Sequence, residues 1–314
     1  MNNAMEPRTT PRNGEDGVVS RPGFFDTPAG RNAREFISSP VALAATFVLT
    51  IVLVLAIFAP AISIQNPHDL NAIDIMDARL PPGSTGWAGS YYILGTDSQG
   101  RDMLSAILYG LRTSLLVAVV SGAAALTIGI GVGLLAAYCG GRVETVLMRI
   151  VDIQLSFPAI LIALVMLAVL GRGIDKVIAA LVFVQWAYYA RTARGAAMSE
   201  LKKEYMEAAR CLALSPRLIL VSHLLPNSLP PIIVVATMQI ASAIAIEATL
   251  SFLGLGLPVT EPSLGLLISN GFNVMMSGYY WISIFPGVAL LITVMSVNLM
   301  GDRLRDILNP RSKR

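Results

Sequence analysis

The sequence has few charged side chains. Asp, Glu, Lys and Arg make up 14% of the 314 residues, whereas an average soluble domain carries roughly 25%. The hydrophobic set makes up 54%, and it arrives in blocks near the length of about 20 residues that a helix needs to cross roughly 30 Å of hydrocarbon. A water-soluble core cannot absorb this excess, so the sequence predicts an all-α integral membrane protein.

Cysteine and histidine are also scarce. Cys139 and Cys211 belong to no CxxC or similar ligand pattern, and His68 and His223 lie far apart in the chain. We therefore expect two unpaired thiols and no bound metal or cofactor. A net charge of +3 argues against a nucleic-acid partner. No pairing of a nucleophile with a base is recognisable, which disfavours an intramembrane enzyme.

The long apolar blocks predict six transmembrane helices. The first block contains no charge, and the fourth is short, with Asp175 and Lys176 at its outer end. The predicted spans are 41–62, 113–138, 146–170, 174–190, 229–256 and 280–300.

The distribution of Lys and Arg predicts the orientation. With the N-terminus inside, the cytoplasmic segments hold 18 of these residues and the opposite side holds five. Because Lys and Arg are enriched in cytoplasmic loops, both termini are expected in the cytoplasm.

Composition divides the chain into four parts. Residues 1–35 are rich in Arg, Pro, Gly and Asn and are predicted to form a disordered cytoplasmic tail without a cleavable signal. Residues 36–112 hold the first span and an extracytoplasmic excursion. Residues 113–301 hold the other spans, and residues 302–314 form a second cytoplasmic tail.

The segment 195–227 is too polar to span a membrane and too apolar for a simple solvated connector. Its first half predicts a helix with one apolar face, because the apolar positions recur every three or four residues. That face is formed by Met198, Leu201, Tyr205, Ala208 and Leu212. A second helix is predicted to begin with Ser215 as its N-cap and Pro216 in its first turn. The pair suits either docking into another protein or lying on the membrane surface, and the pattern alone does not decide between them.

Two short motifs in this segment carry a family resemblance. Glu207-Ala208-Ala209, followed by a spaced Leu225-Pro226, resembles the EAA signature of type I ABC importer permeases, the loop that inserts into the ATPase subunit. Ala213 stands where that family usually has glycine. The departure is expected to restrict the bend between the two helices.

Three further segments are similar to the C-type permease subunits of dipeptide, oligopeptide and nickel importers. They are residues 94–115 before the second span, residues 247–256 continuing to Pro262-Ser263-Leu264-Gly265, and the tail 298–311. Four motifs in the right order extend the resemblance over about residues 36–311.

The resemblance implies the type I permease fold with cytoplasmic coupling helices and a bacterial inner-membrane location. It also implies four partners: ABC ATPase subunits that use ATP, a second permease of the B-type, an extracytoplasmic solute-binding protein, and the lipid bilayer. The expected cargo is peptide, with nickel or another small solute as the alternative. This chain itself is expected to hydrolyse nothing.

Besides Asp175 at the outer end of the fourth span, two acidic residues lie inside predicted spans. An ionised side chain at the bilayer centre costs several kcal/mol unless it faces water or a partner. Glu247 is therefore a candidate for the substrate path or a gate, with a structural hydrogen bond to Thr249 or Ser251 as the alternative. Asp152 is similarly placed, and helix packing is the favoured interpretation for it.

Small residues and a polar loop complete the candidates. The glycines at 129, 131 and 133 are expected to let a neighbouring helix approach closely. Asp97, Arg101 and Asp102 are expected to hold a turn together, with a position at the outer mouth of the pore as the alternative.

A different functional class is a self-contained carrier, which needs its own coupling-ion site. Only Glu247 and Asp152 are candidates for one, and no inverted repeat is visible. Co-purification in mild detergent separates the two classes, because only an ATP-driven importer predicts associated ATPase subunits.

Overall fold

A computed structural model describes residues 34–69, 73–258 and 260–308 of the chain. Most of the predicted N-terminal tail and residues 309–314 of the predicted C-terminal tail lie outside the described residues. The fold is helical, apart from a two-stranded antiparallel ribbon formed by β1 (Ser84–Thr85) and β2 (Tyr91–Tyr92). The all-α prediction is confirmed.

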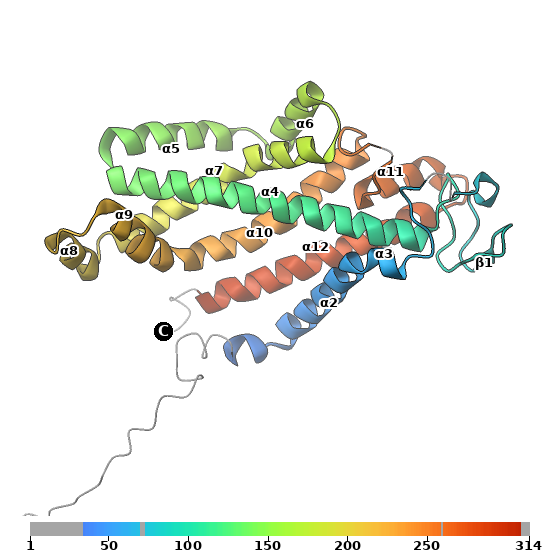
Figure 1. Ribbon diagram of the computed structural model, residues 1–314, viewed down its shortest axis with the longest axis horizontal. Helices are drawn as coiled ribbons and strands as arrows, with labels where there is room; N and C mark the ends of the chain where they lie inside the picture. The colour runs from blue at the N-terminus through green and yellow to red at the C-terminus, as the bar shows by residue number, and fades with distance from the viewer. Residues whose placement is uncertain (1–33, 70–72, 259, 309–314) are drawn as a thin grey trace, which may run out of the picture.

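The longest helices run roughly along the long axis of the molecule (Figure 1). They are α2 (Pro40–Ile57), α4 (Met103–Cys139), α7 (Ile174–Glu200), α10 (Leu225–Phe252) and α12 (Trp281–Leu308). The buried apolar core lies mainly between them. Shorter elements complete the chain: α3 (Ala59–Ile62), the 3₁₀ turn η3 (Ile75–Asp77), α5 (Gly141–Ser156), α6 (Ala159–Leu170), α8 (Glu204–Cys211), α9 (Pro216–Leu218), the π-helical turn η4 (Ile219–Leu224) and α11 (Leu264–Met275).

Different secondary-structure elements form the two ends of this bundle (Figure 1). The ribbon, α3 and the start of α4 form one end, which we call the outer end. Helices α8 and α9 form the other, which we call the coupling end, and the start of α2 and the end of α12 lie toward it. The Arg303 guanidinium donates to the Glu35 carbonyl oxygen over 2.8 Å and joins those two chain ends.

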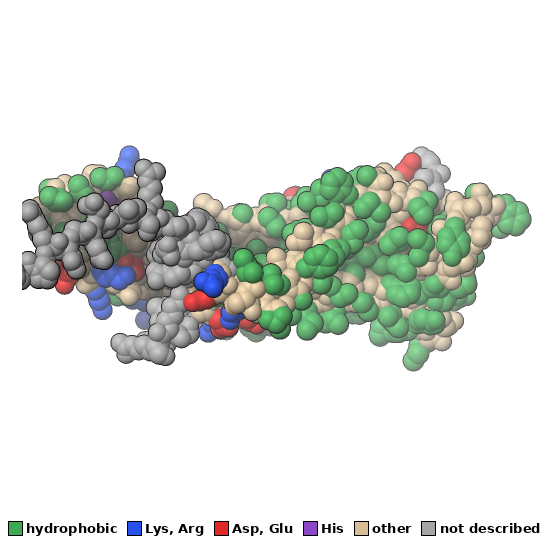
Figure 2. Space-filling view, turned by 90° about the horizontal axis from the view of Figure 1, so that it is seen from below, with side chains coloured by type: hydrophobic (Ala, Val, Ile, Leu, Met, Phe, Trp, Pro, Cys, Tyr) green, Lys and Arg blue, Asp and Glu red, His purple; other side chains and the backbone are tan. Residues whose placement is uncertain are grey.

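The surface between the ends is apolar. Figure 2 shows hydrophobic side chains over much of the length of one face, with most of its charged side chains toward the coupling end. Among the described residues, four helices are long and apolar enough to cross a bilayer, namely α2, α4, the continuous run 216–252 and α12. The bent pair α5 and α6 would make a fifth. The count of six spans therefore stays a prediction.

Helix α7 is absent from that set because its composition is less apolar. Much of its length is buried against α4 and α10, and it carries Gln185, Arg191 and Arg194 in place of lipid-facing apolar residues. Glycines in α4 allow the close contact with α7. A Cβ on Gly129 would lie 2.4 Å from the Tyr189 Cβ, and one on Gly133 would lie 2.5 Å from the Ala190 carbonyl oxygen. The predicted close approach is confirmed at these two glycines, whereas Gly131 faces open space.

Several helices extend beyond the predicted spans or divide them. Asp102 caps α4, accepting from the Ser105 N–H at 2.8 Å, so this helix begins ten residues before the predicted 113. The single predicted span 146–170 is two helices bent by 89°. Pro158 disfavours helical geometry at the preceding residue, and Phe157 is extended, with φ −96° and ψ 143°. Helix α11, capped by Ser263, was not predicted.

Candidate functional site

The segment after α7 is divided differently from the prediction. Helix α7 continues to Glu200, a short turn follows, and α8 begins at Glu204. The predicted single helix with one apolar face is therefore wrong. Within α8 the buried residues are Met206 and Ala209, whereas Ala208 is exposed and Leu212 is 73% exposed. The apolar face was misassigned because the break at 201–203 changes the helical phase.

Helix α8 is anchored to the bundle by its buried side. Met206 packs in a cluster with Leu134 of α4, Ala197 of α7 and Leu224 of η4. The opposite side, with Glu207 and Ala208, faces outward. Helix α8 therefore joins three elements of the bundle while keeping one face uncovered.

A carboxylate at the end of α7 fixes the start of this segment. Glu200 accepts hydrogen bonds from the Lys203 ammonium and the Tyr205 hydroxyl, each at 2.7 Å. Burial, together with the negative charge and the hydrogen bond of Glu200, raises the pKa of Tyr205 to about 12. The phenol therefore stays protonated and remains a donor at physiological pH.

The turn between α8 and α9 needs a left-handed residue. Ala213 has φ 50°, a conformation that glycine adopts freely and alanine adopts at a cost of about 1 kcal/mol. The chain makes the bend that the alanine was expected to restrict. Ser215 then caps α9, accepting from the Leu218 N–H at 3.4 Å, with Pro216 in the first turn, as predicted.

The predicted second cytoplasmic helix and the fifth span are one continuous helical run from Pro216 to Phe252. It passes through η4 before α10 begins at Leu225-Pro226. Pro226 has no N–H to donate, and a π turn before it accommodates the missing bond. The Asn227 amide also donates to the His223 carbonyl oxygen over 2.7 Å. A displacement of α8 and α9 can therefore pass directly along α10.

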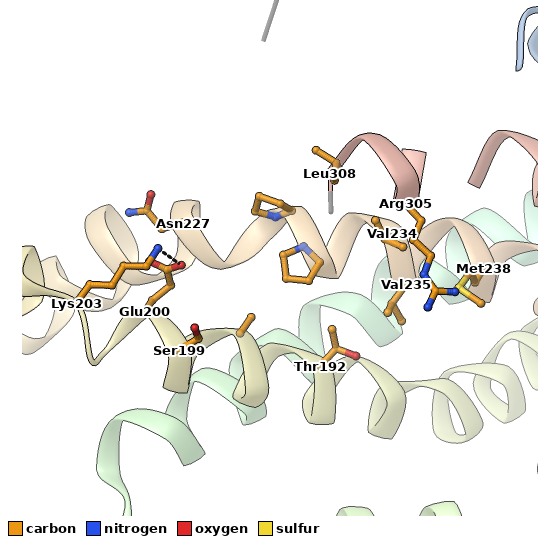
Figure 3. A pocket seen from close by; sticks show the side chains of 13 residues that line it. Thr192, Ser199, Glu200, Lys203, Asn227, Val234, Val235, Met238, Arg305 and Leu308 are labelled. Atoms are coloured by element: carbon orange, nitrogen blue, oxygen red, sulfur yellow. Dashed lines mark hydrogen bonds and ion pairs between the residues drawn. The ribbon is translucent and has the colours of Figure 1, made fainter. Parts of the chain in front are cut away.

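A cavity of about 720 Å³ opens beside this segment. Helices α7, α10 and α12 line it (Figure 3). Pro230, Pro231 and Val234 supply apolar wall, the Glu200–Lys203 pair lies at one end, and the Arg305 side chain lies near Met238 at the other.

Glu247 is fully buried where α10 meets α4 and α11. Its carboxylate accepts from the Ser114 hydroxyl at 2.7 Å and from the Ser251 hydroxyl at 2.8 Å. Thr249 donates instead to the Ala245 carbonyl oxygen. The structure thus contains the hydrogen bond to Ser251 that was the alternative to a gate.

Asp152 lies on the surface of α5, against α7. Its carboxylate pairs with Arg191 at 2.5 Å, and both side chains are 54% exposed. Arg194 pairs with Glu144 one helical turn further along. These three partners were not singled out from the sequence. The sequence contained a signal for these ion pairs, because Glu144 and Asp152 lie about two helical turns apart and so share one side of a helix.

The outer end holds the polar loop predicted to be structural. Arg101 and Asp97 form an ion pair at 2.7 Å with both side chains 2% exposed, and Asp102 caps α4. The Trp281 indole N–H donates to the Thr96 carbonyl oxygen over 3.2 Å, which joins this loop to α12. The structural interpretation of Asp97, Arg101 and Asp102 is confirmed.

Acidic, histidine and cysteine side chains do not gather into a potential metal site anywhere in the described ranges 34–69, 73–258 and 260–308. Cys139 and Cys211 are free and exposed.

These features define a multi-pass membrane protein, a bundle of long helices with the short helices α8 and α9 exposed at one end. Residues 129–314 match the family of inner membrane components of binding-protein-dependent transport systems. Residues 27–82 match the N-terminal transmembrane domain of oligopeptide transport permease C. The chain belongs to this family of transport permeases.

Curated relatives support the same assignment over most of the chain. A probable D,D-dipeptide transport system permease protein of Escherichia coli K12 is 36% identical over 274 residues, covering 87% of this chain and 89% of the relative. The dipeptide transport system permease protein of Bacillus subtilis 168 is 32% identical, covering 96% and 91%. A di/tripeptide transport system permease protein of Pseudomonas aeruginosa UCBPP-PA14 is 33% identical, covering 92% and 94%.

A solved structure confirms the fold. A chain of the MetNI methionine ABC transporter in an inward-facing conformation matches with a TM-score of 0.54 at 24% identity. The match covers 65% of this chain and 97% of the other. The predicted type I importer fold is thereby confirmed.

Proposed function

We propose that this chain forms half of a membrane path for peptide uptake and that separate ATPase subunits drive it through α8. A second, B-type permease completes the path, and an extracytoplasmic binding protein delivers the cargo. The relatives named as dipeptide and di/tripeptide permeases support peptide as the cargo. Nickel or another small solute is the alternative cargo for the same machinery.

The observation that carries the ATPase contact is the uncovered face of α8. Glu207, Ala208 and Leu212 are exposed while the opposite side of α8 is buried in the bundle. In this proposal the ATPase covers Leu212 together with Glu207 and Ala208, so that the apolar side chain is buried in the contact and the carboxylate fixes its orientation. Ala209 is buried, so in this proposal it seats α8 and makes no contact with the ATPase.

The connections of α8 suit it to transmit force. Ala213 sets the turn, and Leu225 and Pro226 lie in the helical run that continues into the membrane as α10. At the other side, Glu200 ties the start of the segment to the end of α7. Movement of α8 by a bound ATPase would therefore displace two long helices together.

The proposed orientation puts the coupling end in the cytoplasm. The described chain ends and α8 lie toward the same end of the bundle (Figure 1). The excess of Lys and Arg in the segments of that end supports the cytoplasmic side.

In this proposal Glu247 holds α4 against α10, and the path runs elsewhere. Glu247 does not line the cavity between α7, α10 and α12. It also does not line a second hollow, the groove between α5 and α7 that holds Asp152 and Arg191. Asp152 lies in the groove and is the better candidate for the path.

The test is a charge reversal on α8. Glu207→Lys is expected to reduce ATP-dependent peptide uptake to background, because it places a cation in the proposed contact, while membrane insertion stays normal. The measurement is uptake of radiolabelled dipeptide together with the amount of ATPase subunit that co-purifies in mild detergent.

Asp302→Lys supplies the matched control, since it makes the same charge change on an exposed residue of α12 toward the same end. It is expected to keep uptake. Full transport with an assembled ATPase in Glu207→Lys would overturn the docking role, and uptake by the purified chain alone would overturn ATP-driven transport.

A further inference from the structure

The cavity between α7, α10 and α12 carries one charge that the described part of the chain leaves unpaired. Arg305 of α12 is exposed, and its side chain lies in the cavity near Met238 (Figure 3). No described residue forms an ion pair or a hydrogen bond with its guanidinium. At the other end of the cavity, Glu200 and Lys203 pair with each other at 2.7 Å. The charged residues of the lining therefore sum to one positive charge.

The wall of the cavity between these charged ends is apolar on the α10 side. It is formed by Pro230, Pro231, Val234, Val235 and Met238, and the axis of α10 rises about 12 Å from the first of these residues to the last. The volume of about 720 Å³ lies within the range of roughly 300–1,000 Å³ that small-molecule sites occupy. The cavity thus fits a compound with an apolar body better than it fits a single ion.

The unpaired guanidinium selects the charge of that compound. A guanidinium binds a carboxylate through two parallel N–H donors, and such charge-assisted hydrogen bonds are about twice as strong as neutral ones. A cation would be repelled by Arg305, and the Glu200 carboxylate already accepts from Lys203 and Tyr205. The lining is therefore complementary to an amphipathic compound with a single negative charge.

The direction of the cavity favours a dissolved ligand over a membrane lipid. Arg305 follows residues 281–301 of α12, which contain no charged side chain, so it lies past the apolar part of that helix. The apolar wall extends from Arg305 toward Glu200 and Lys203 at the coupling end (Figure 3). The acyl chains of a phospholipid held at Arg305 would have to extend the opposite way to reach the bilayer. A ligand that enters from the coupling end can lie along the wall.

The position of the cavity connects its occupancy to the movement of α8. Its walls include the last turns of α7, which ends at Glu200, and the first turns of α10, which begins at Leu225. The segment that contains α8 joins these two helices. A ligand between them fills the space into which they would close. Binding therefore opposes any displacement that brings the two helices together.

We propose that this cavity binds an amphipathic monoanion from the coupling side, with the anionic group on Arg305 and the apolar body against Pro230, Pro231 and Val234, and that the bound anion slows transport. This inference rests on the proposed function, because it needs an ATPase that moves α8. The cavity then acts as a regulatory site, separate from the path of the transported solute.

The test uses the importer with its partner subunits in lipid nanodiscs and decanoate as the probe. Decanoate carries one carboxylate on an apolar chain, and decanol carries the same chain without the charge. Calorimetry measures binding, and ATP hydrolysis stimulated by peptide-loaded binding protein measures coupling. Decanoate is expected to bind saturably and to remove most of the stimulated hydrolysis, whereas decanol is expected to do neither.

Arg305→Gln is expected to raise the Kd for decanoate by roughly tenfold or more, which is the factor that a hydrogen bond to a charged group contributes. Stimulated hydrolysis without decanoate is expected to stay unchanged. Arg112→Gln is the matched control, because it removes the same charge from an exposed residue of α4 outside the cavity. Ala196→Leu, which narrows the cavity from α7, is a second variant that is expected to weaken binding.

Three outcomes would overturn the site: no binding of decanoate to the assembled importer, equal affinity in the wild type and Arg305→Gln, or equal binding of decanol. Binding that leaves stimulated hydrolysis unchanged would overturn the regulatory role.

Stimulated hydrolysis without decanoate separates this inference from the function on which it rests. Normal stimulation without Arg305-dependent binding rejects the site and leaves the proposed function standing. Arg305-dependent binding in a protein that shows no stimulation rejects ATP-driven transport, and the regulatory role with it, and leaves the binding site standing.

Discussion

The outer end and the coupling end of the bundle differ in whether their charged side chains are buried and paired within this chain or exposed at its surface. At the outer end, Asp97 and Arg101 form a buried ion pair and Asp102 caps a helix. At the coupling end, Glu207 and Leu212 are exposed and Ala213 holds a left-handed conformation. Asp97, Arg101 and Asp102 thus find charged or polar partners within this chain, whereas the coupling end keeps an uncovered face that suits a moving partner.

The largest expected effect comes from breaking the outer ion pair. Arg101→Met leaves the Asp97 carboxylate buried without its cation, and removal of one partner of a buried pair costs about 3–5 kcal/mol. Lys203→Met makes the same change in the Glu200–Lys203 pair of the coupling end, where the lysine is 54% exposed. Its expected cost is about 0–1 kcal/mol.

The measurement is the free energy of unfolding of the detergent-solubilised protein in denaturant. Similar losses of unfolding free energy in the two variants would show that the ion pair at the outer end contributes no more to stability than the pair at the coupling end.

A smaller effect is expected at Tyr92, which lies on β2 at the outer end. Its hydroxyl donates to the Asp77 carboxylate over 2.9 Å, and burial, followed by that hydrogen bond and the charge of Asp77, raises the pKa of Tyr92 to about 12. Tyr92→Phe is expected to cost about 1–2 kcal/mol at neutral pH, because Asp77 loses a donor.

The pH dependence has a defined sign. A raised pKa in the folded protein means that the stabilisation is fully present below the ordinary tyrosine pKa of 10.0 and is lost as the pH rises toward about 12. Tyr92→Phe is therefore expected to make the fall in stability above about pH 10 shallower. An unchanged slope in thermal unfolding measured across this range would contradict the role of Tyr92. Tyr205→Phe provides the comparison at the coupling end, where the pKa is raised to the same value.

The smallest effect is a gain in stability at the coupling end. Ala213→Gly is expected to stabilise the turn by about 0.5–1 kcal/mol, because glycine adopts φ 50° without the steric cost that alanine bears. Slower hydrogen exchange of the amides in α8 measures this gain.

Ala208→Gly is the matched control for this change. It places the same substitution inside α8, where glycine costs about 1 kcal/mol, so exchange is expected to become faster. Faster exchange in Ala213→Gly as well would show that Ala213 carries no strain.

The sequence predicts local features well where one residue type decides them. Ser215 and Pro216 begin α9 as expected because a side-chain cap and a missing N–H act within one turn. Gly129 and Gly133 meet α7 as expected because only glycine lets the backbones come so close. The break at Phe157-Pro158 was also predictable, because proline disfavours helical geometry at the preceding residue. The apolar composition of 146–170 led to the prediction of one continuous span instead.

Features that depend on neighbours were harder to predict. The burial of Met206 in place of Ala208 follows from the break at 201–203, which rotates α8 relative to α7. Arg191 and Arg194 count as cytoplasmic charges in the sequence, but they lie beside α5 because α7 continues ten residues past its predicted end.

The sequence by itself determined that this protein lies in a membrane as a helical bundle, because apolar blocks of sufficient length have no other stable environment. Its motifs also identified the family. Only the tertiary structure decided which face of each helix is covered, since coverage depends on the phase and direction of neighbouring helices. That is why the exposed face of α8 became visible only when its neighbours were in place.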